Sequence, residues 1–330
     1  MTSACRRERM SEHALLLGST PSHRIWGGTV LARHLGVIGG DPIGELWLAY
    51  DANPVLSGVH AGRRVADVLA ELGSSFIGAV PFERYGLELP LLIKFLDTAE
   101  WLSVQVHPGD AFAHTVEHES GFHGKTEAWY ILEGEGELIY GVSEPVGRDA
   151  LRAAALEGPI GALLSHVLVA PGDVLYVPAG TIHALGPGLV LYEVQQRSDL
   201  TYRLYDYGRS RDLQLERGLE VARLNPAAAP KLVSQPGEGG TVLLASDAFM
   251  LVRHDLDGAD TIAAPAESFL LLTLVNGTAC WHGRDLRWGE TLLIGAGSSV
   301  QLRGRGTLLA SLVPSPSRLR GYAGAVHAPI

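Results

Sequence analysis

The stretch that decides the fold reads WLSVQVHPGD at residues 101–110 and, after an irregular segment, GKTEAWYILEGEGELIYG at residues 124–141. Gln105 and His107 stand two apart in a run in which every second residue is apolar. Side chains with this spacing point to the same face of a β-strand. Glu127 opens another run of strand-forming residues. The stretch therefore predicts two strands that carry an amide, an imidazole and a carboxylate.

A second stretch, GDVLYVPAGTIHALG at residues 172–186, completes this pattern. Its histidine, His183, follows an apolar strand and a Pro-Ala-Gly turn. If the sheet curls into a barrel, His183 can meet the three polar residues of the first stretch and complete a cage for a metal ion.

The spacing of these residues resembles the two metal-binding motifs of the cupin barrels. Six residues separate Glu127 from Gly134, and the intervals between Gly172 and His183 match the second motif. Gln105 stands in place of the first of the usual two histidines, and residues 108–126 lengthen the usual gap before the glutamate. The resemblance implies a mainly β fold of two cupin-type (jelly-roll) barrels, with helical insertions on the first.

The second barrel is expected because the chain repeats itself weakly. Residues 289–300, GETLLIGAGSSV, align with residues 172–183 at a constant offset of 117. Val300 then stands where His183 was, and Leu270 stands where Glu127 was. Two ligand positions have become apolar, so we expect a degenerate barrel without metal.

A chain of 330 residues is longer than a single hydrophobic core usually supports, so two domains are expected. Helical spacing predicts helices within Arg63–Leu72 and Arg148–Leu164, the second with a break at Gly158-Pro159. The Pro-, Ala- and Gly-rich segment 225–240 is the best linker candidate. The predicted organisation has four parts: a flexible N-terminal tail at 1–20, a metal-binding catalytic cupin domain with helical insertions at 21–224, the linker at 225–240, and the degenerate cupin domain at 241–330.

The composition of the chain argues against nucleic acids and membranes as binding partners. A net charge of −10 offers no electrostatic footprint for a nucleic acid. No apolar stretch approaches the roughly 18 residues of a membrane span, and the run Ala14–Leu17 is too short for the core of a signal peptide. Two cysteines cannot build a disulfide framework. We expect a cytoplasmic protein, a monomer or a homodimer, that binds neither nucleic acid nor membrane.

The predicted cage suggests both a metal and a reaction. A Gln, two neutral His and a Glu sum to a charge of −1 and include no thiolate, so zinc is the first expectation, with Mn, Fe, Co and Ni able to bind. Lys125 lies two residues before Glu127 on the same face, and Glu193 and Arg203 lie on the next two predicted strands. A carboxylate, an ammonium and a fixed cation around a Lewis-acidic metal suit proton abstraction next to a carbonyl.

Several longer segments of the sequence resemble one known family. The chain resembles type I mannose-6-phosphate isomerase (phosphomannose isomerase) over about its first two-thirds. The resemblance is carried by WGG at 26–28, PLLIKFLDTAEWLSVQVHPGD at 90–110, GKTEAWYIL at 124–132, PAGTIHALG at 178–186 and QQRSDLTYRLYDYGR at 195–209. The family interconverts mannose 6-phosphate and fructose 6-phosphate through a cis-enediol, with a proton moved between C1 and C2. The resemblance therefore implies a zinc enzyme with a hexose 6-phosphate substrate.

The resemblance also assigns residues by position. It implies Gln105, His107, Glu127 and His183 as zinc ligands, Lys125, Glu193 and Arg203 as catalytic residues, and Ser103 and Arg209 as contacts to the substrate phosphate. The remaining histidines of the insertion, His114, His118 and His123, are interpreted as surface or loop residues.

Other functions fit the same barrel. An Fe(II)-dependent cupin dioxygenase would share the cage without a phosphate contact. A cupin-type isomerase could act on another sugar, phosphorylated or not. A non-catalytic sugar-binding cupin would bind a sugar phosphate without turnover.

Overall fold

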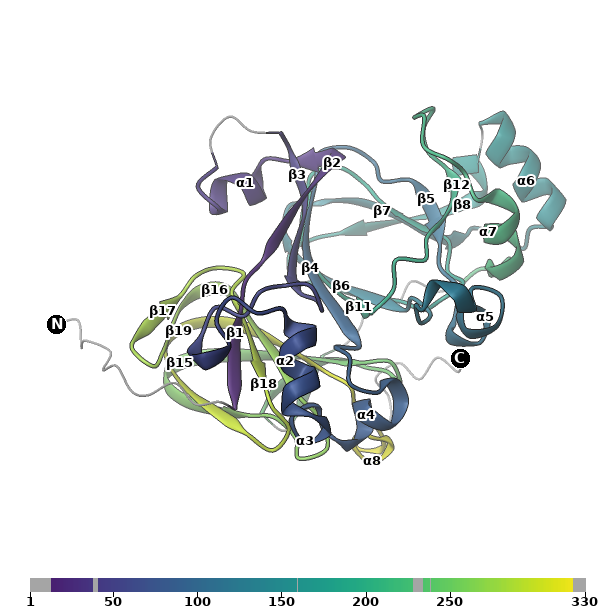
Figure 1. Ribbon diagram of the computed structural model, residues 1–330. Helices are drawn as coiled ribbons and strands as arrows, with labels where there is room; N and C mark the ends of the chain where they lie inside the picture. Colours follow the sequence, from purple (N-terminus) through teal and green to yellow (C-terminus); the bar gives the residue numbers. More distant parts are fainter. Residues whose placement is uncertain (1–12, 38–40, 159, 228–233, 238, 323–330) are drawn as a thin grey trace. The chain divides into compact units, whose positions relative to one another are not determined.

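The computed structural model describes residues 13–37, 41–158, 160–227, 234–237 and 239–322 (Figure 1). The chain divides into two compact units. The described residues of the central unit lie within 22–46 and 95–231, and those of the terminal unit lie within 1–21, 47–94 and 232–329.

Two sheets carry the fold of the central unit. The five-stranded sheet has the order β12-β5-β10-β7-β8, and the six-stranded sheet has the order β2-β3-β4-β11-β6-β9. The strands of the first are β12 (Tyr202–Tyr205), β5 (Val104–Val106), β10 (His183–Leu185), β7 (Gly136–Val142) and β8 (Leu164–Val169). Those of the second are β2 (Thr20–Gly28), β3 (Ile43–Ala49), β4 (Leu91–Thr98), β11 (Leu189–Gln196), β6 (Glu127–Glu133) and β9 (Val174–Val177).

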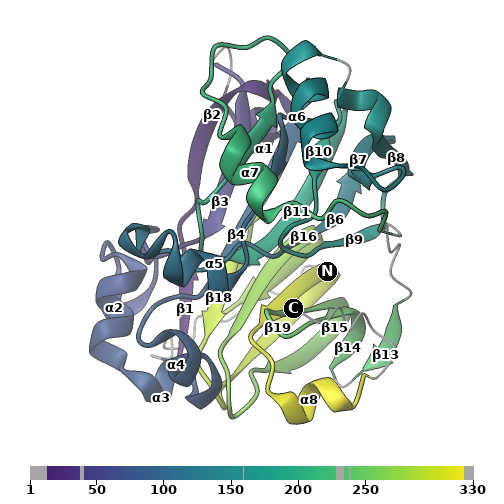
Figure 2. The same cartoon turned by 90° about the vertical axis from the view of Figure 1, so that its right-hand side faces the viewer.

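Helices cover one face of the five-stranded sheet. The helices of the central unit are α1 (Val30–His34), α5 (Asp110–Thr115), η2 (His118–Ser120), α6 (Arg148–Glu157), η3 (Ile160–Leu163) and α7 (Leu215–Val221). Figure 2 shows α6 and α7 beside this sheet, where Leu151 and Leu219 share a buried apolar cluster with Val104 and Val106. The expected helix at Arg148–Leu164 thus packs outside the sheet, as predicted. It ends at Glu157 because Gly158 takes a left-handed φ of 102°.

Alternation along the strands separates the two faces of the sheet. Val104 and Val106 face α6 and α7, so Gln105 between them points to the opposite side. A second apolar cluster contains Trp129 and Ile131 of β6 together with Leu185 of β10. Strands of both sheets thus contribute to one interior, and the polar side chains predicted to bind metal lie on strands that border it.

The terminal unit contains an eight-stranded sheet. Its order is β1-β18-β16-β19-β15-β14-β13, with β17 paired to β16. The strands are β1 (Ala14–Leu17), β13 (Gln235–Gly237), β14 (Gly240–Ala245), β15 (Met250–Ala263), β16 (Leu270–Trp281), β17 (Arg284–Leu286), β18 (Thr291–Ile294) and β19 (Ser299–Leu312). The helices are η1 (Gly58–His60), α2 (Val65–Leu72), α3 (Ser74–Ile77), α4 (Ala79–Tyr85) and α8 (Pro316–Arg320).

The predicted repeat is visible in the strand register. In the central unit Glu127 pairs with Val177, and in the terminal unit Leu270 pairs with Ile294, which lies 117 residues after Val177. Val300 pairs with Ile262, as His183 pairs with Gln105. Leu270, Ile262 and Val300 all belong to the buried apolar core of the terminal unit. The positions that correspond to the predicted ligands are therefore filled by hydrocarbon.

Three observations differ from the organisation expected from the sequence. Ala14–Leu17, inside the predicted flexible tail, forms β1 and pairs with β18 because all four side chains are buried apolar groups. Residues 47–94, expected in the catalytic domain, belong to the terminal unit. The linker predicted at 225–240 lies partly outside the described residues, and Gln235–Gly237 within it forms β13. The domain boundaries taken from the sequence stay a prediction.

The turn between β6 and β7 supplies a test of the fold. Gly134 has a φ of 86°, and a Cβ there would overlap the carbonyl oxygen of Gly188. We expect Gly134→Ala to lower the free energy of unfolding by about 2 kcal/mol or more, measured by urea denaturation, because an L side chain is strained at this φ. Gly147→Ala is the matched control, since Gly147 has a φ of −79° and open space around its Cβ position. Equal losses for both variants would contradict this explanation.

Candidate active site

The register of three neighbouring strands brings polar side chains together in the central unit. His183 on β10 pairs directly with Gln105 on β5, and Gln105 pairs in turn with Arg203 on β12. Directly opposed residues point to the same face of a sheet. An imidazole, an amide and a guanidinium therefore lie side by side.

The other predicted ligands approach the same point. Nitrogen and oxygen atoms of His107, Glu127 and His183 all lie within 4.8 Å of one another. His183 Nε2 is 3.2 Å from Glu127 Oε1 and 3.2 Å from Gln105 Nε2. His107 Nε2 is 3.5 Å from Glu127 Oε2. The structure thus brings together all four residues that the sequence predicted as ligands.

Backbone carbonyls fix the orientation of both imidazoles. The Nδ1 atom of His107 lies 2.9 Å from the carbonyl oxygen of Leu200, and that of His183 lies 2.9 Å from the carbonyl oxygen of Thr181. A carbonyl only accepts, so each Nδ1 carries the proton and each Nε2 presents a lone pair to the cluster. This is the tautomer that metal ligation through Nε2 requires.

Gln105 can complete the ligand set through its amide oxygen. Its amide lies between Ser103 Oγ, at 3.4 Å, and His183 Nε2. A half-turn of the amide exchanges oxygen and nitrogen without changing its shape. The oxygen then points to the cluster, while the nitrogen donates to the buried hydroxyl of Ser103.

The cluster is almost completely removed from water. His107, Glu127 and His183 are each 1% exposed. Lys125, 5% exposed, donates from Nζ to Glu127 Oε2 at 2.5 Å and lies 2.9 Å from His107 Nε2. Burial lowers the pKa of His183, so that its neutral form, the ligating form, is favoured. Two imidazoles, a carboxylate and an amide in a dry site fit a divalent ion with N and O preferences such as zinc.

Glu193 lies farther along the same interior. It is 4% exposed, stands opposite Trp129 in the β11–β6 register, and accepts a 3.0 Å hydrogen bond from the indole nitrogen. The Trp129 ring lies 5.5 Å from that of His183. Glu193 is therefore connected to the cluster through the indole.

The two predicted phosphate contacts have different surroundings. Ser103 is buried beside Gln105. Arg209 pairs with Glu100 at 2.9 Å and with Asp206 at 3.3 Å. A phosphate on Arg209 would therefore compete with these carboxylates for the guanidinium, and Glu100 is the exposed one of the two.

One cation near Arg203, Arg24, was missed by sequence reasoning. Burial and the neighbouring Arg211 lower the pKa of the Arg203 guanidinium, and Arg24 acts in the same direction. The Nε atom of Arg203 is buried without a hydrogen-bond partner. Arg24, on β2, is 179 residues away in the chain, so no local pattern could have placed it there.

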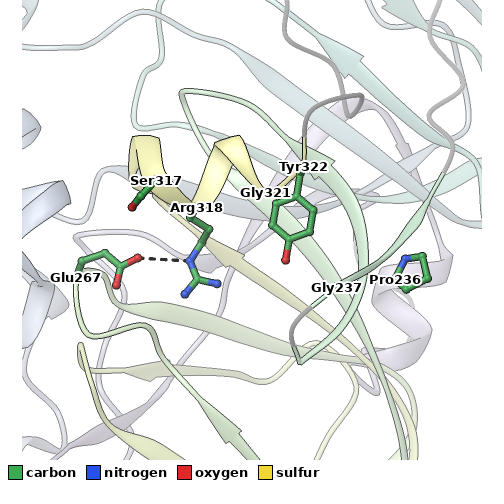
Figure 3. Close-up of a pocket in the computed structure, with 7 residues that line it drawn as sticks. All are labelled: Pro236, Gly237, Glu267, Ser317, Arg318, Gly321 and Tyr322. Carbon is green, nitrogen blue, oxygen red and sulfur yellow. Dashed lines mark hydrogen bonds and ion pairs between the residues drawn. The ribbon is translucent and has the colours of Figure 1, made fainter.

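A surface hollow elsewhere lacks this chemistry. It has a volume of about 660 Å³ and lies in the terminal unit beside α8, where Arg318 pairs with Glu267 at 3.4 Å (Figure 3). Its lining also includes Tyr322 and Pro236 but no histidine. We assign it no part in the metal centre.

Comparison with known proteins identifies the family. Residues 15–147 match the family described as phosphomannose isomerase type I, catalytic domain. The mannose-6-phosphate isomerase of Streptococcus mutans is 37% identical over 299 residues, which cover 85% of this chain and 92% of that protein. The chain belongs to the type I phosphomannose isomerase family.

Solved structures of this family share the fold. The mannose 6-phosphate isomerase from Bacillus subtilis matches with a TM-score of 0.78 and 30% identity, over 91% of this chain and 99% of that one. A zinc-bound mannose 6-phosphate isomerase matches with a TM-score of 0.73 and 19% identity, over 92% and 100% of the two chains. The predicted cupin fold class is thereby confirmed. Among the described helices, none combines the length and the apolar character that a membrane crossing needs.

Metal binding can be tested on one ligand. Glu127→Gln keeps the shape of the side chain but removes the carboxylate charge that two imidazoles and Lys125 contact. We expect this variant to lose the divalent ion retained by the unmodified protein, measured by elemental analysis after gel filtration. Glu137→Gln is the control and should keep the ion, because Glu137 is a half-exposed carboxylate that pairs with His166. An unchanged metal content in Glu127→Gln would remove Glu127 from the ligand set.

Proposed function

We propose that the buried cluster is the zinc site of an enzyme that interconverts D-mannose 6-phosphate and D-fructose 6-phosphate. Membership of the type I phosphomannose isomerase family supports this reaction. The observation that carries the site is the convergence of His107, Glu127 and His183 within 4.8 Å, all buried, with both Nε2 atoms facing the carboxylate. Gln105 completes the ligands in this proposal.

The bound zinc ion would supply Lewis acidity toward a substrate oxygen. The chain's own residues supply the rest. The Lys125 ammonium, held between Glu127 and His107, keeps a proton at Nζ inside the site. Glu193 keeps a buried carboxylate at the same interior, oriented by the indole of Trp129. These two groups are the candidates for moving the proton between C1 and C2 through the cis-enediol.

Arg203 contributes a fixed positive charge. Its place beside Gln105 in the sheet sets the guanidinium next to the cluster, where it can stabilise a developing oxyanion. Ser103 and Arg209 are the proposed contacts to the phosphate of the hexose 6-phosphate. A cytoplasmic location and a monomeric or homodimeric state complete the proposal on sequence grounds alone.

The function is tested by a coupled assay that converts mannose 6-phosphate to fructose 6-phosphate. We expect turnover, loss of turnover after chelation, and recovery when zinc is added back, because in this proposal the bound ion supplies the Lewis acidity that the reaction needs. Free mannose is the control substrate and should turn over poorly without its phosphate. Turnover unaffected by complete removal of metal would contradict the proposal. Oxygen uptake with bound iron would favour a dioxygenase instead.

Arg203 is tested separately from the metal. We expect Arg203→Ala to lower kcat by about 10²–10³-fold, the usual cost of removing a group that stabilises transition-state charge. Zinc content should not change, because Arg203 is not a ligand in this proposal. Arg148→Ala, an exposed arginine on α6, is the matched control. Equal turnover in both variants would remove Arg203 from the mechanism.

A further inference from the structure

A second group of metal-ligating side chains lies in the insertion between His107 and Glu127. Atoms of Asp110, His114 and His123 lie within 4.8 Å of one another. The sequence led us to interpret His114 and His123 as surface or loop residues. The structure brings them into one group with a carboxylate.

Helix α5 and the returning chain build this group. Asp110 and His114 are four residues apart on α5, so both side chains lie on one face of the helix. His123 comes from the segment that returns to the start of α5. The return is close because Gly124 lies against the backbone of Gly109 and Asp110, where a Cβ would overlap the Asp110 nitrogen.

Hydrogen bonds hold the carboxylate in place. Asp110 Oδ1 accepts from the backbone nitrogen of Gly124 at 2.8 Å and from Nε2 of Gln196 at 3.0 Å. Such bonds orient a carboxylate without using all of its lone pairs, as the outer partners of metal ligands do. The Gln196 side chain is anchored in turn by the backbone nitrogen of Thr126, at 3.0 Å from its Oε1.

The two imidazoles meet at metal-ligand spacing. His114 Nε2 and His123 Nδ1 are 2.9 Å apart, and the ring planes are 85° apart. Two nitrogens at about 2.05 Å from one ion, with an angle of about 90–110° between them, are separated by about 2.9–3.4 Å. Two facing imidazole lone pairs repel each other, so either a shared proton or a cation must lie between them.

We propose that Asp110, His114 and His123 form a second site for a divalent transition metal, separate from the catalytic cluster. Two imidazoles and one carboxylate suit Zn²⁺, and also Ni²⁺ or Co²⁺, with water in the remaining positions because His114 is exposed. The site does not depend on the proposed reaction, since none of its residues belongs to the isomerase cluster.

The ion would clamp the insertion at both ends. Asp110 lies three residues after His107, and His123 lies two residues before Lys125. The backbone nitrogen of Lys125 also donates a hydrogen bond of 2.9 Å to the carbonyl oxygen of Pro108. An ion on this site therefore ties together the two chain segments that deliver His107 and Lys125 to the catalytic cluster.

The test is a count of zinc ions on the full-length protein. At saturating free Zn²⁺ in equilibrium dialysis, we expect the unmodified protein to bind a second ion per chain, weaker than the first. The double variant His114→Gln/His123→Gln should lose that second ion and keep the first. His118→Gln, in the same insertion but bonded to the Thr115 carbonyl, should keep both. Equal zinc counts in the unmodified protein and the double variant would overturn the proposal.

A second measurement needs no variant and so does not depend on the folding of one. Diethyl pyrocarbonate modifies accessible imidazoles, and peptide mass spectrometry locates the modified residues. Added Zn²⁺ should reduce modification of His114 and His123 while leaving the exposed His118 unchanged. Modification of all three histidines at the same rate with and without Zn²⁺ would show an ordinary hydrogen bond between the two rings and no metal site.

Discussion

The polar cluster of the central unit is organised around one buried carboxylate and the groups that neutralise it. Glu127 is 1% exposed, and an ionised carboxylate in such a place is tolerated only when it is paired and hydrogen-bonded. The Lys125 ammonium supplies the charge, and the Nε2 atoms of His107 and His183 face the two oxygens. A divalent ion bound through Nε2 of His107 would displace the ammonium from that nitrogen, while Glu127 Oε2 could keep its bond to Lys125. Lys125 would then stay beside the metal site.

Strand register explains how distant residues reach this carboxylate. The β10–β5–β12 pairing aligns His183, Gln105 and Arg203 across one sheet face, and the alternation of β5 sends its valines to the helices behind. A slip of one residue in β5 would exchange amide for valine and destroy the site. The apolar packing of α6 and α7 behind the sheet thus keeps the polar cluster on the opposite face.

Much of this site could be predicted from the sequence, because its information is local. Alternation predicted that Gln105 and His107 share one face, and motif spacing predicted candidate ligands, three of which, His107, Glu127 and His183, the structure brings within 4.8 Å of one another. What failed depends on contacts between distant residues. Ala14–Leu17 is too short to signal a strand until β18, nearly 280 residues later, supplies its partner. The neighbours of Arg203 and the meeting of His114 with His123 likewise appear only when separate segments approach in space.

The repeated strands allow the two interiors to be compared position by position, with polar residues in one and apolar residues in the other. The register that presents Glu127 and His183 in one unit presents Leu270 and Val300 in the other, and glycines with left-handed φ occupy matching turns at Gly134 and Gly277. The architecture therefore forms without charged groups at these positions. Burial of apolar side chains at these positions stabilises the folded state. Buried polar side chains there need hydrogen-bond or ion-pair partners to replace their lost contacts with water. The polar residues of the central unit therefore lower the stability of the sheets that carry them. In the terminal unit, apolar residues occupy the corresponding positions and stabilise the fold.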